Sequence, residues 1–308
     1  MENNIIPMKK EQVAGFYRFM LGDFEINALY DSSLQYPPEI FSDFTSLNKE
    51  QIEEMLDNDF APKTDEGLRE IVLNAYLINT GNHLILVDAG IGEIDSPVFI
   101  DKKGHLVENI KAAGYTPEQI DIILPTHLHF DHISGIEAKG KMVFPNATVY
   151  LAKEEQDFWL SKPVEDYPQN LQEYVKLAQM ALEPYKKAGR IKIFNSGDEI
   201  IENIKSVPLF GHTPGQVGFL FSSKDKELLI SGDFIHIKSV QLNHPEIGDI
   251  FDINPIEAGK TRLKVLPKIA ERKMLLAVSH FPFPGIGHIR KTDSGYEWHQ
   301  IEYSLLRK

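Results

Sequence analysis

The chain has 308 residues, 42% of them hydrophobic, so it can bury a sizeable core in one large domain or two ordinary ones. Its formal net charge of −13 disfavours a general nucleic-acid binder, because phosphate backbones need a basic surface. The sequence has no cysteine, which excludes disulfides and thiolate ligands and leaves nitrogen and oxygen donors for any metal.

The N-terminal region lacks the pattern of a secretory signal. Lys9 and Lys10 are not followed by an apolar run, and no stretch approaches the roughly 18 apolar residues of a membrane helix. We therefore expect a cytoplasmic protein that does not insert into membranes.

The first half of the chain predicts two hairpins and three short helices. The hairpins turn at Gly22-Asp23, within residues 16–30, and at Gly81-Asn82, between 71–80 and 83–88. The helices are expected from Lys49 to Leu56, over 105–113, and from Thr116-Pro117-Glu118.

The second half begins with a helical pattern from Ala152 to about Gly189. Further elements are strands at 191–195, 205–210, 217–222 and 227–231, a helix from Asn254-Pro255 to about Ala270, and a last buried strand from Met274 to Ser279. Strands dominate each half and each half ends in a helix. This order predicts two packed sheets with helices outside, in one domain over 1–308 with a helical insertion at about 152–189.

Residues 126–132, Thr-His-Leu-His-Phe-Asp-His, gather three imidazoles and a carboxylate. His127 and His129 are two positions apart, so in an extended segment both point the same way, while Asp131 and His132 are offset and can face a second ion. An apolar strand signal at 120–124 runs into the motif. The segment therefore indicates a ligand loop at the end of a buried strand rather than a histidine-rich surface loop.

Four other segments place a histidine or aspartate just past an apolar run. They contain Asp88, His212, Asp233 and His280. A lone histidine at a strand end is usually structural. Together with the histidine cluster, however, the last three residues complete seven nitrogen and oxygen ligands, enough for two ions that share a bridging carboxylate.

The pattern HxHxDH, followed by a later His, Asp and His, resembles the metallo-β-lactamase superfamily. The resemblance implies an α/β fold, an αββα sandwich of two mixed β-sheets flanked by helices, with a two-metal site on one edge. It assigns His127, His129 and His212 to metal one, Asp131, His132 and His280 to metal two, and Asp233 to the bridge. Asp88 would orient a ligand histidine.

The stretches at 15–29, 74–90 and 280–291 are similar to the branch that includes methyl parathion hydrolase and related aryl-ester and lactone hydrolases. That branch carries out metal-dependent hydrolysis of esters, lactones or organophosphate triesters, and several members are homodimers. We therefore expect a homodimer that binds a small-molecule substrate. Quorum-sensing lactonases carry a tyrosine three residues after the bridging aspartate, where this chain has His236.

The expected chemistry uses two divalent ions to generate hydroxide near neutral pH, with Asp131, Asp233 and His236 as catalytic residues. Zinc is the first expectation, with manganese, cobalt and iron open. His236 either replaces the missing tyrosine or packs beside the site. Because a phenolate leaves without acid help, the sequence predicts faster hydrolysis of aryl substrates than of acyl-homoserine lactones.

The resemblance also implies a substrate wall of Phe99 and Trp159, and Phe281 and His288 are expected to line the cleft because they follow the last ligand. Three alternatives stay open: an acyl-homoserine lactonase, a glyoxalase II-like thioesterase and a non-catalytic metal-binding protein. The thioesterase requires a C-terminal basic cluster, and here only Arg290, Lys291, Arg307 and Lys308 are present.

Overall fold

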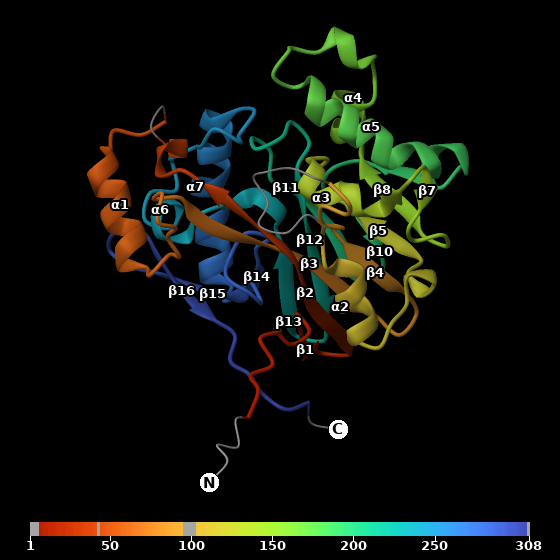
Figure 1. Ribbon diagram of the computed structural model, residues 1–308, viewed down its shortest axis with the longest axis horizontal. Helices are drawn as coiled ribbons and strands as arrows, with labels where there is room; N and C mark the ends of the chain where they lie inside the picture. The colour runs from red at the N-terminus through yellow and green to blue at the C-terminus, as the bar shows by residue number, and fades with distance from the viewer. Residues whose placement is uncertain (1–5, 42–43, 95–102, 307–308) are drawn as a thin grey trace.

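The computed structural model describes residues 6–41, 44–94 and 103–306. Two seven-stranded sheets pack face to face with helices on their outer faces, which confirms the expected αββα sandwich (Figure 1). Among the described residues, no helix is both long and apolar enough to cross a membrane.

The first sheet has the strand order β1-β2-β3-β4-β5-β8-β9. Its strands are β1 Phe16–Leu21, β2 Phe24–Tyr36, β3 Arg69–Asn79, β4 Leu84–Val87, β5 Ile122–Leu124, β8 Thr148–Ala152 and β9 Ile191–Phe194. In this sheet β4, β5, β8 and β9 run parallel to one another, and β1, β2, β3 and β4 pair antiparallel in that order.

The second sheet has the order β10-β11-β12-β13-β14-β15-β16, with one parallel pair, β13 and β14. Its strands are β10 Glu199–Ile201, β11 Ile204–Pro208, β12 Val217–Ser223, β13 Lys226–Ile230, β14 Leu275–Ala277, β15 Ile286–Lys291 and β16 Tyr296–Gln300. A small separate hairpin joins β6 Glu137–Ala138 to β7 Lys141–Met142.

Helices cover both sheets. The α-helices are α1 Lys49–Asn58, α2 Leu106–Ala112, α3 Phe130–Ile133, α4 Lys153–Trp159, α5 Gln172–Lys187, α6 Lys238–Gln241 and α7 Pro255–Glu271. The 3-10 helices are η1 Pro38–Phe41, η2 Pro117–Gln119, η3 Ser134–Ile136, η4 Val164–Asp166 and η5 Gly232–Phe234. Figure 1 shows α1 and α6 on one side of the upper end and α4 and α5 on the other, with both chain termini at the opposite end.

The hydrophobic core has three layers. Residues of both sheets meet in the central layer, α2, α4 and α5 cover the outer face of the first sheet, and α7 covers the second. The central strand β4, Leu-Ile-Leu-Val, is buried at every position because it pairs on both sides and is covered on both faces. A fourth cluster packs α1, η1 and α6 together at the edge.

Both predicted hairpins are confirmed. Phe24 pairs with Leu21 and Leu84 with Asn79, and Gly22 and Gly81 take the positive φ that such tight turns require. The chain does not, however, end its strands at residue 279.

β15 and β16 follow as an edge hairpin with several exposed polar positions, which gives no buried-strand signal. The prediction also missed β8, which occupies 148–152 before the helical segment begins at Lys153, and the short edge strand β10.

Two of the parallel strand pairs position the site. β4 and β5 are parallel neighbours, so the residues after them, Asp88 and Thr126, emerge at the same edge of the first sheet. β13 and β14 do the same in the second sheet for Asp233 and His280. Because carboxyl ends of parallel strands converge, four loops meet at one edge of the sandwich.

Candidate metal centre

The seven side chains expected to bind metal come from loops at this edge. His127 and His129 lie between β5 and α3, and Asp131 and His132 lie in α3 itself. His212 follows β11, Asp233 lies in η5 after β13, and His280 follows β14. The fold thus brings together residues that are far apart along the chain.

The seven residues form two groups that share Asp233. His127, His129, His212 and Asp233 make one group, and Asp131, His132, Asp233 and His280 make the other. Within each group the potential ligand atoms all lie within 4.8 Å of one another. This spatial division is the one that the resemblance to the metallo-β-lactamase superfamily implies.

Asp233 lies at the centre of the cluster. Its Oδ2 atom is 3.0 Å from His280 Nε2, 3.4 Å from His212 Nε2 and 3.8 Å from His127 Nε2. Its Oδ1 atom lies 3.0 Å from His132 Nε2. One carboxylate therefore faces both groups, as a bridging ligand must.

Several of these atoms are buried without a hydrogen bond. They include Nε2 of His127, Nε2 of His132 and Oδ1 of Asp233, the last two being close together but not aligned for a hydrogen bond. Buried polar atoms normally have partners. Ligand atoms that converge on one point without hydrogen bonds fit divalent ions. A set made only of nitrogen and oxygen ligands suits zinc, manganese, cobalt or iron.

Asp88 holds one of the histidines in place. Its Oδ2 atom lies 2.9 Å from His132 Nδ1, and its two oxygens accept hydrogen bonds from the Thr126 backbone N–H at 2.7 Å and the Thr126 hydroxyl at 2.9 Å. Because a carboxylate only accepts, Nδ1 of His132 carries the proton and Nε2 faces Asp233. This geometry agrees with the orienting role predicted for Asp88.

Sequence reasoning missed two carboxylates in the loop before α7. Asp252 Oδ1 lies 3.0 Å from His212 Nδ1, and Asp249 Oδ2 lies 2.9 Å from His236 Nδ1. Both aspartates are buried. Their segment, 248–254, has no strand or motif signal and resembles an ordinary polar loop that leads to the helix cap Asn254, so the sequence offered no means of finding them.

Glu155 was also missed, because on α4 it looked like one of several solvent-facing acids. It is buried, and accepts hydrogen bonds from Leu128 N at 2.9 Å, Gly215 N at 3.0 Å and the Thr213 hydroxyl. Burial raises the pKa of Glu155 to about 7. The residue joins the loop of His127 and His129 to the loop of His212.

Burial also sets the protonation of the histidines. It lowers the pKa of His129 to about 4 and holds the pKa values of His127 and His212 well below the usual range. The neutral imidazole that results is the form that binds metal. His132 differs, because the charges of Asp233, Asp131 and Asp88 overcome the effect of burial and raise its pKa.

His236 belongs to the same cluster. Its Nε2 atom lies 3.2 Å from Asp233 Oδ2, and its ring stacks on that of His280 with centroids 5.2 Å apart. The sequence left open whether this residue faces the site or only packs near it. The structure places it directly against the shared carboxylate.

A cavity of about 310 Å³ opens beside His236 and His280. Its other walls are mostly apolar and come from β2, the segment after α1, β3, α6 and the segment after β14: Tyr36, Asp59, Phe60, Ala61, Pro62, Glu70, Ile71, Val72, Ile237, Lys238, Ser239, Phe281 and Pro282. An ion pair between Lys238 and Asp59 ties α6 to the end of α1.

Phe60 is unusual among the residues that line this cavity. It is 92% exposed, and its φ of 54° lies in the left-handed region, at the position after a helix end where glycine is favoured. An exposed aromatic side chain on a strained backbone beside a cavity is a candidate for substrate contact.

The expected substrate wall lies elsewhere in the fold. Trp159, the last residue of α4, is fully buried in the core, where its ring meets His129 edge-on at 5.5 Å, so the structure corrects its prediction as part of a substrate wall. Phe281 borders the cavity, although its side chain is buried against Trp298. Phe99 lies outside the described residues.

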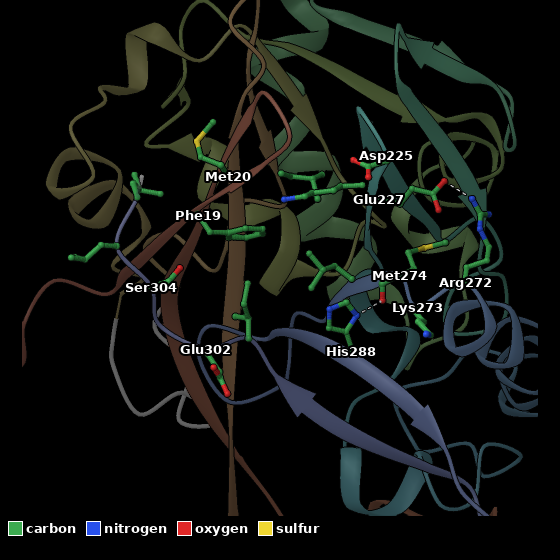
Figure 2. Close-up of a pocket in the computed structure, with 16 residues that line it drawn as sticks. Phe19, Met20, Asp225, Glu227, Arg272, Lys273, Met274, His288, Glu302 and Ser304 are labelled. Carbon is green, nitrogen blue, oxygen red and sulfur yellow. Dashed lines mark hydrogen bonds and ion pairs between the residues drawn. The ribbon is translucent and has the colours of Figure 1, made fainter. Parts of the chain in front are cut away.

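The prediction for His288 is wrong. It lies on β15, which runs antiparallel to β14 and so carries the chain away from His280. It lines a cavity of about 720 Å³ away from the clustered residues, together with Met274 and Arg272 (Figure 2), and its Nδ1 atom lies 3.2 Å from the Met274 carbonyl oxygen.

Comparison with known proteins agrees with this geometry. The model of the metallo-beta-lactamase superfamily matches residues 69–280, which contain all seven clustered residues. Among curated proteins, an N-acyl homoserine lactonase of a Bacillus species is 25% identical over 191 residues, covering 57% of this chain and 68% of that protein. A Bacillus cereus N-acyl homoserine lactonase is 24% identical, with 54% and 65% covered, so the chain spans about two thirds of these relatives' length.

Solved structures match over nearly the whole chain. Hydrolase AbOPH of the beta lactamase superfamily is 36% identical with a TM-score of 0.86, and covers 96% of this chain and all of its own. AidC, a dizinc quorum-quenching lactonase solved with its product, is 26% identical with a TM-score of 0.84 and the same coverage. The chain therefore belongs to the metallo-β-lactamase superfamily and is one of its metal-dependent hydrolases.

Proposed function

We propose that this hydrolase opens lactones and cleaves carboxylic esters, using two divalent ions, zinc first. One ion would be held by His127, His129 and His212, the other by Asp131, His132 and His280, and Asp233 would contact both. When bound, such ions supply a hydroxide near neutral pH and polarise the carbonyl oxygen of the substrate.

The observation that carries the proposal is the placement of His236. Its Nε2 atom faces Asp233 Oδ2 at 3.2 Å, and the residue also lines the apolar cavity, so it borders both the shared carboxylate and the space open to a substrate. Hydrolysis would add hydroxide to the carbonyl carbon and break the bond to the leaving oxygen. His236 Nε2 would pass the proton of the attacking oxygen to the leaving oxygen, which would yield a carboxylate and an alcohol.

This proton transfer widens the range of substrates that the sequence suggested. An alkoxide leaving group needs a proton, whereas a phenolate does not, and the expectation of faster aryl hydrolysis was based on the absence of the lactonase tyrosine. His236 occupies a position from which it can supply that proton. The lactonase relatives support the same substrate class, so we take acyl-homoserine lactones as the first substrates to test.

The size and lining of the cavity limit which chemical groups a bound substrate can have. A volume of about 310 Å³ with walls such as Ile71, Val72 and Ile237 suits one short acyl chain or one aromatic ring. Asp131 and Asp233 would help to hold the two ions, and Asp233 also contacts His236 of the cavity wall.

A substrate panel tests the proposal. Zinc-loaded protein is assayed with acyl-homoserine lactones of increasing chain length, aryl esters, a thioester and an aryl phosphotriester. We expect turnover of lactones and aryl esters, with the thioester slower. Turnover of the phosphotriester alone would contradict the proposal.

Aryl-ester hydrolysis is the second candidate for the main activity. It is favoured by the aromatic rings of Tyr36, Phe60 and Phe281 around the cavity, since stacking on a ring stabilises a bound aryl group. A kcat/KM for aryl esters well above that for every lactone would select it.

The homodimer and the cytoplasmic location stay predictions. Light scattering of the purified protein measures the first, and fractionation of the source cells measures the second.

A further inference from the structure

The short helix α4 supports one of the two groups of clustered residues from behind. The first turn of α4 carries Glu155, whose side chain is buried, and its last residue is Trp159, whose ring meets that of His129 edge-on at 5.5 Å. That histidine belongs to the first group, which consists of His127, His129, His212 and Asp233. Both inward-facing side chains of the helix therefore lie against the first group or the loops that carry it.

The Glu155 carboxylate joins the two loops that carry the three histidines of the first group. Its Oε2 atom accepts a hydrogen bond from Leu128 N at 2.9 Å, in the residue between the first two histidines. Its Oε1 atom accepts from Gly215 N at 3.0 Å and from the Thr213 hydroxyl, both just after the third histidine. One buried side chain thus determines how far apart the two loops lie.

The second of these loops also packs directly on the helix backbone. A Cβ atom at Gly215 would lie 2.4 Å from Glu155 N and 2.7 Å from the Glu154 carbonyl carbon, so no larger residue fits at this position. The loop after β11 is therefore fixed against the start of α4. The carboxylate then fixes the loop after β5 relative to both.

The second group is held by the first sheet instead. The carbonyl oxygen of His132 accepts a hydrogen bond from Ala89 N at 2.7 Å, and its Nδ1 atom lies 2.9 Å from Asp88 Oδ2. Asn74 on β3 donates to the carbonyl oxygens of the residues before and after His280, at 3.1 and 2.7 Å. The two groups thus have different supports, although they share one carboxylate.

We propose that Glu155 is a positioning residue that sets the affinity of the first group for its ion, through the spacing of the two histidine loops. The inference rests on the two ions of the proposed function. Three histidines hold one ion only when their nitrogen atoms keep short, fixed distances, and partners behind the ligands commonly change metal affinity by about 10- to 100-fold. The affinity of the second group does not depend on this carboxylate.

The test compares Glu155→Gln with Asp157→Asn in the full chain. A backbone N–H group only donates, and each oxygen of Glu155 accepts from one of them. An amide of the same size must turn its own N–H₂ group toward either Leu128 N or Gly215 N, so one hydrogen bond is lost. Asp157 undergoes the same change on the same helix, but its side chain is 53% exposed and forms an ion pair with Lys153.

Zinc is titrated into chelator-treated protein labelled with nitrogen-15 histidine, at about pH 8, above the pKa of about 7 that burial gives Glu155. The imidazole resonances, assigned by single substitutions, report each group separately and need no measurement of activity. We expect E155Q to require about 10- to 100-fold more free zinc to shift the resonances of the first group. The midpoint for the second group should change less than about threefold, and D157N should match the wild type in both groups.

Thr213→Val tests the same carboxylate from its other partner. Valine keeps the shape of the side chain but removes the hydroxyl donor, and both backbone N–H groups keep their acceptors. The first group should therefore weaken by a smaller factor, about three- to tenfold, with the second group unchanged. If E155Q does not fold, this variant decides the question.

Unfolding of the metal-free proteins separates positioning from a general loss of stability. A positioning role predicts that the first group weakens selectively in whichever of the two variants folds. Equal weakening of both groups, or an unchanged first group, would overturn the proposal.

Saturation of the wild type below two zinc ions per chain would contradict the two ions of the proposed function. The comparison of E155Q with the wild type at the three histidines of the first group still tests the role of Glu155 in that case.

Discussion

The two ends of the sandwich differ in the polar side chains that they gather, and the volumes of their cavities do not indicate which end holds the clustered residues. The end near the chain termini has the larger hollow, about 720 Å³, and the end where the strand loops converge has one of about 310 Å³. Yet the clustered histidines and carboxylates lie only beside the smaller one. The clustered side chains lie at the carboxyl ends of the parallel strands, and cavity volume does not predict their position.

The two ends also differ in whether their buried polar atoms have hydrogen-bond partners. In the larger hollow the Arg272 guanidinium pairs with Glu227, and His288 is close to a carbonyl oxygen (Figure 2). None of the described residues that line it has a buried side-chain polar atom without a hydrogen bond. At the other end, His127, His132 and Asp233 each have one. Unpartnered buried atoms that converge are a better marker of a ligand site than an open surface.

The largest expected effect is at the shared carboxylate. Asp233→Ala removes the one side chain that faces both groups, so kcat should fall about 1,000-fold or more and metal content should drop with it. Metal analysis and lactone turnover of the purified variant measure this. Asp225→Asn, in the larger hollow, is the matched control and should behave as wild type. Full metal content with near-normal turnover in D233A would remove Asp233 from the site.

Trp159→Ala should mainly affect stability. The side chain, at the end of α4, is fully buried in the core, so its removal should lower the free energy of unfolding by about 3–5 kcal/mol. Denaturant unfolding in excess zinc measures the loss. A variant of wild-type stability with a raised KM for bulky substrates would restore Trp159 as a substrate contact.

His236→Phe should change selectivity while metal binding persists. Phenylalanine fills the space of the ring but transfers no proton, so kcat for a lactone should fall about 100-fold, and far less for an aryl ester. Zinc analysis provides the control for ligand loss. If zinc were lost instead, His236 would have to be counted among the ligands.

Phe60→Gly should affect stability and binding in opposite directions. Glycine is favoured at the left-handed position after α1, so stability should be unchanged or rise by about 0.5–1 kcal/mol. Loss of an exposed aromatic ring at the cavity should raise KM for apolar substrates about tenfold. Thermal unfolding and initial-rate kinetics measure the two effects. An unchanged KM would show that Phe60 does not contact substrate.

His288→Ala should have the smallest effect. Its side chain lies at the far end, in contact with a carbonyl oxygen of its own sheet, so stability should change by less than about 0.5 kcal/mol and kinetics should not change. A kinetic defect in this variant would link the two ends of the sandwich and contradict the separation described above.

The contiguous half of the site could be read from the sequence. His127, His129, Asp131 and His132 lie in a single short segment after a clear apolar strand, and the later histidines and aspartate each follow such a strand. Their type and position at strand ends predicted seven ligands for two ions, and the order of strands and helices predicted two packed sheets with helices outside. The grouping of the ligands followed from the resemblance to the superfamily.

The supporting residues could not be predicted in the same way. Asp249, Asp252 and Glu155 act through contacts that only the folded chain creates, and locally they resemble loop or helix-surface acids. The residues predicted to contact the substrate were wrong for a related reason. Trp159 looks the same in sequence whether it lines a cavity or fills a core, and His288 is close to His280 in sequence while the intervening hairpin carries it away.

The central claim is that the clustered residues bind two ions on which hydrolysis depends. Zinc is titrated into chelator-treated wild-type protein while bound zinc and lactone turnover are both measured. The account predicts that binding saturates at about two zinc ions per chain and that turnover reaches its maximum only as the second is bound. Saturation at or below one ion per chain, or turnover that persists without metal, would contradict it.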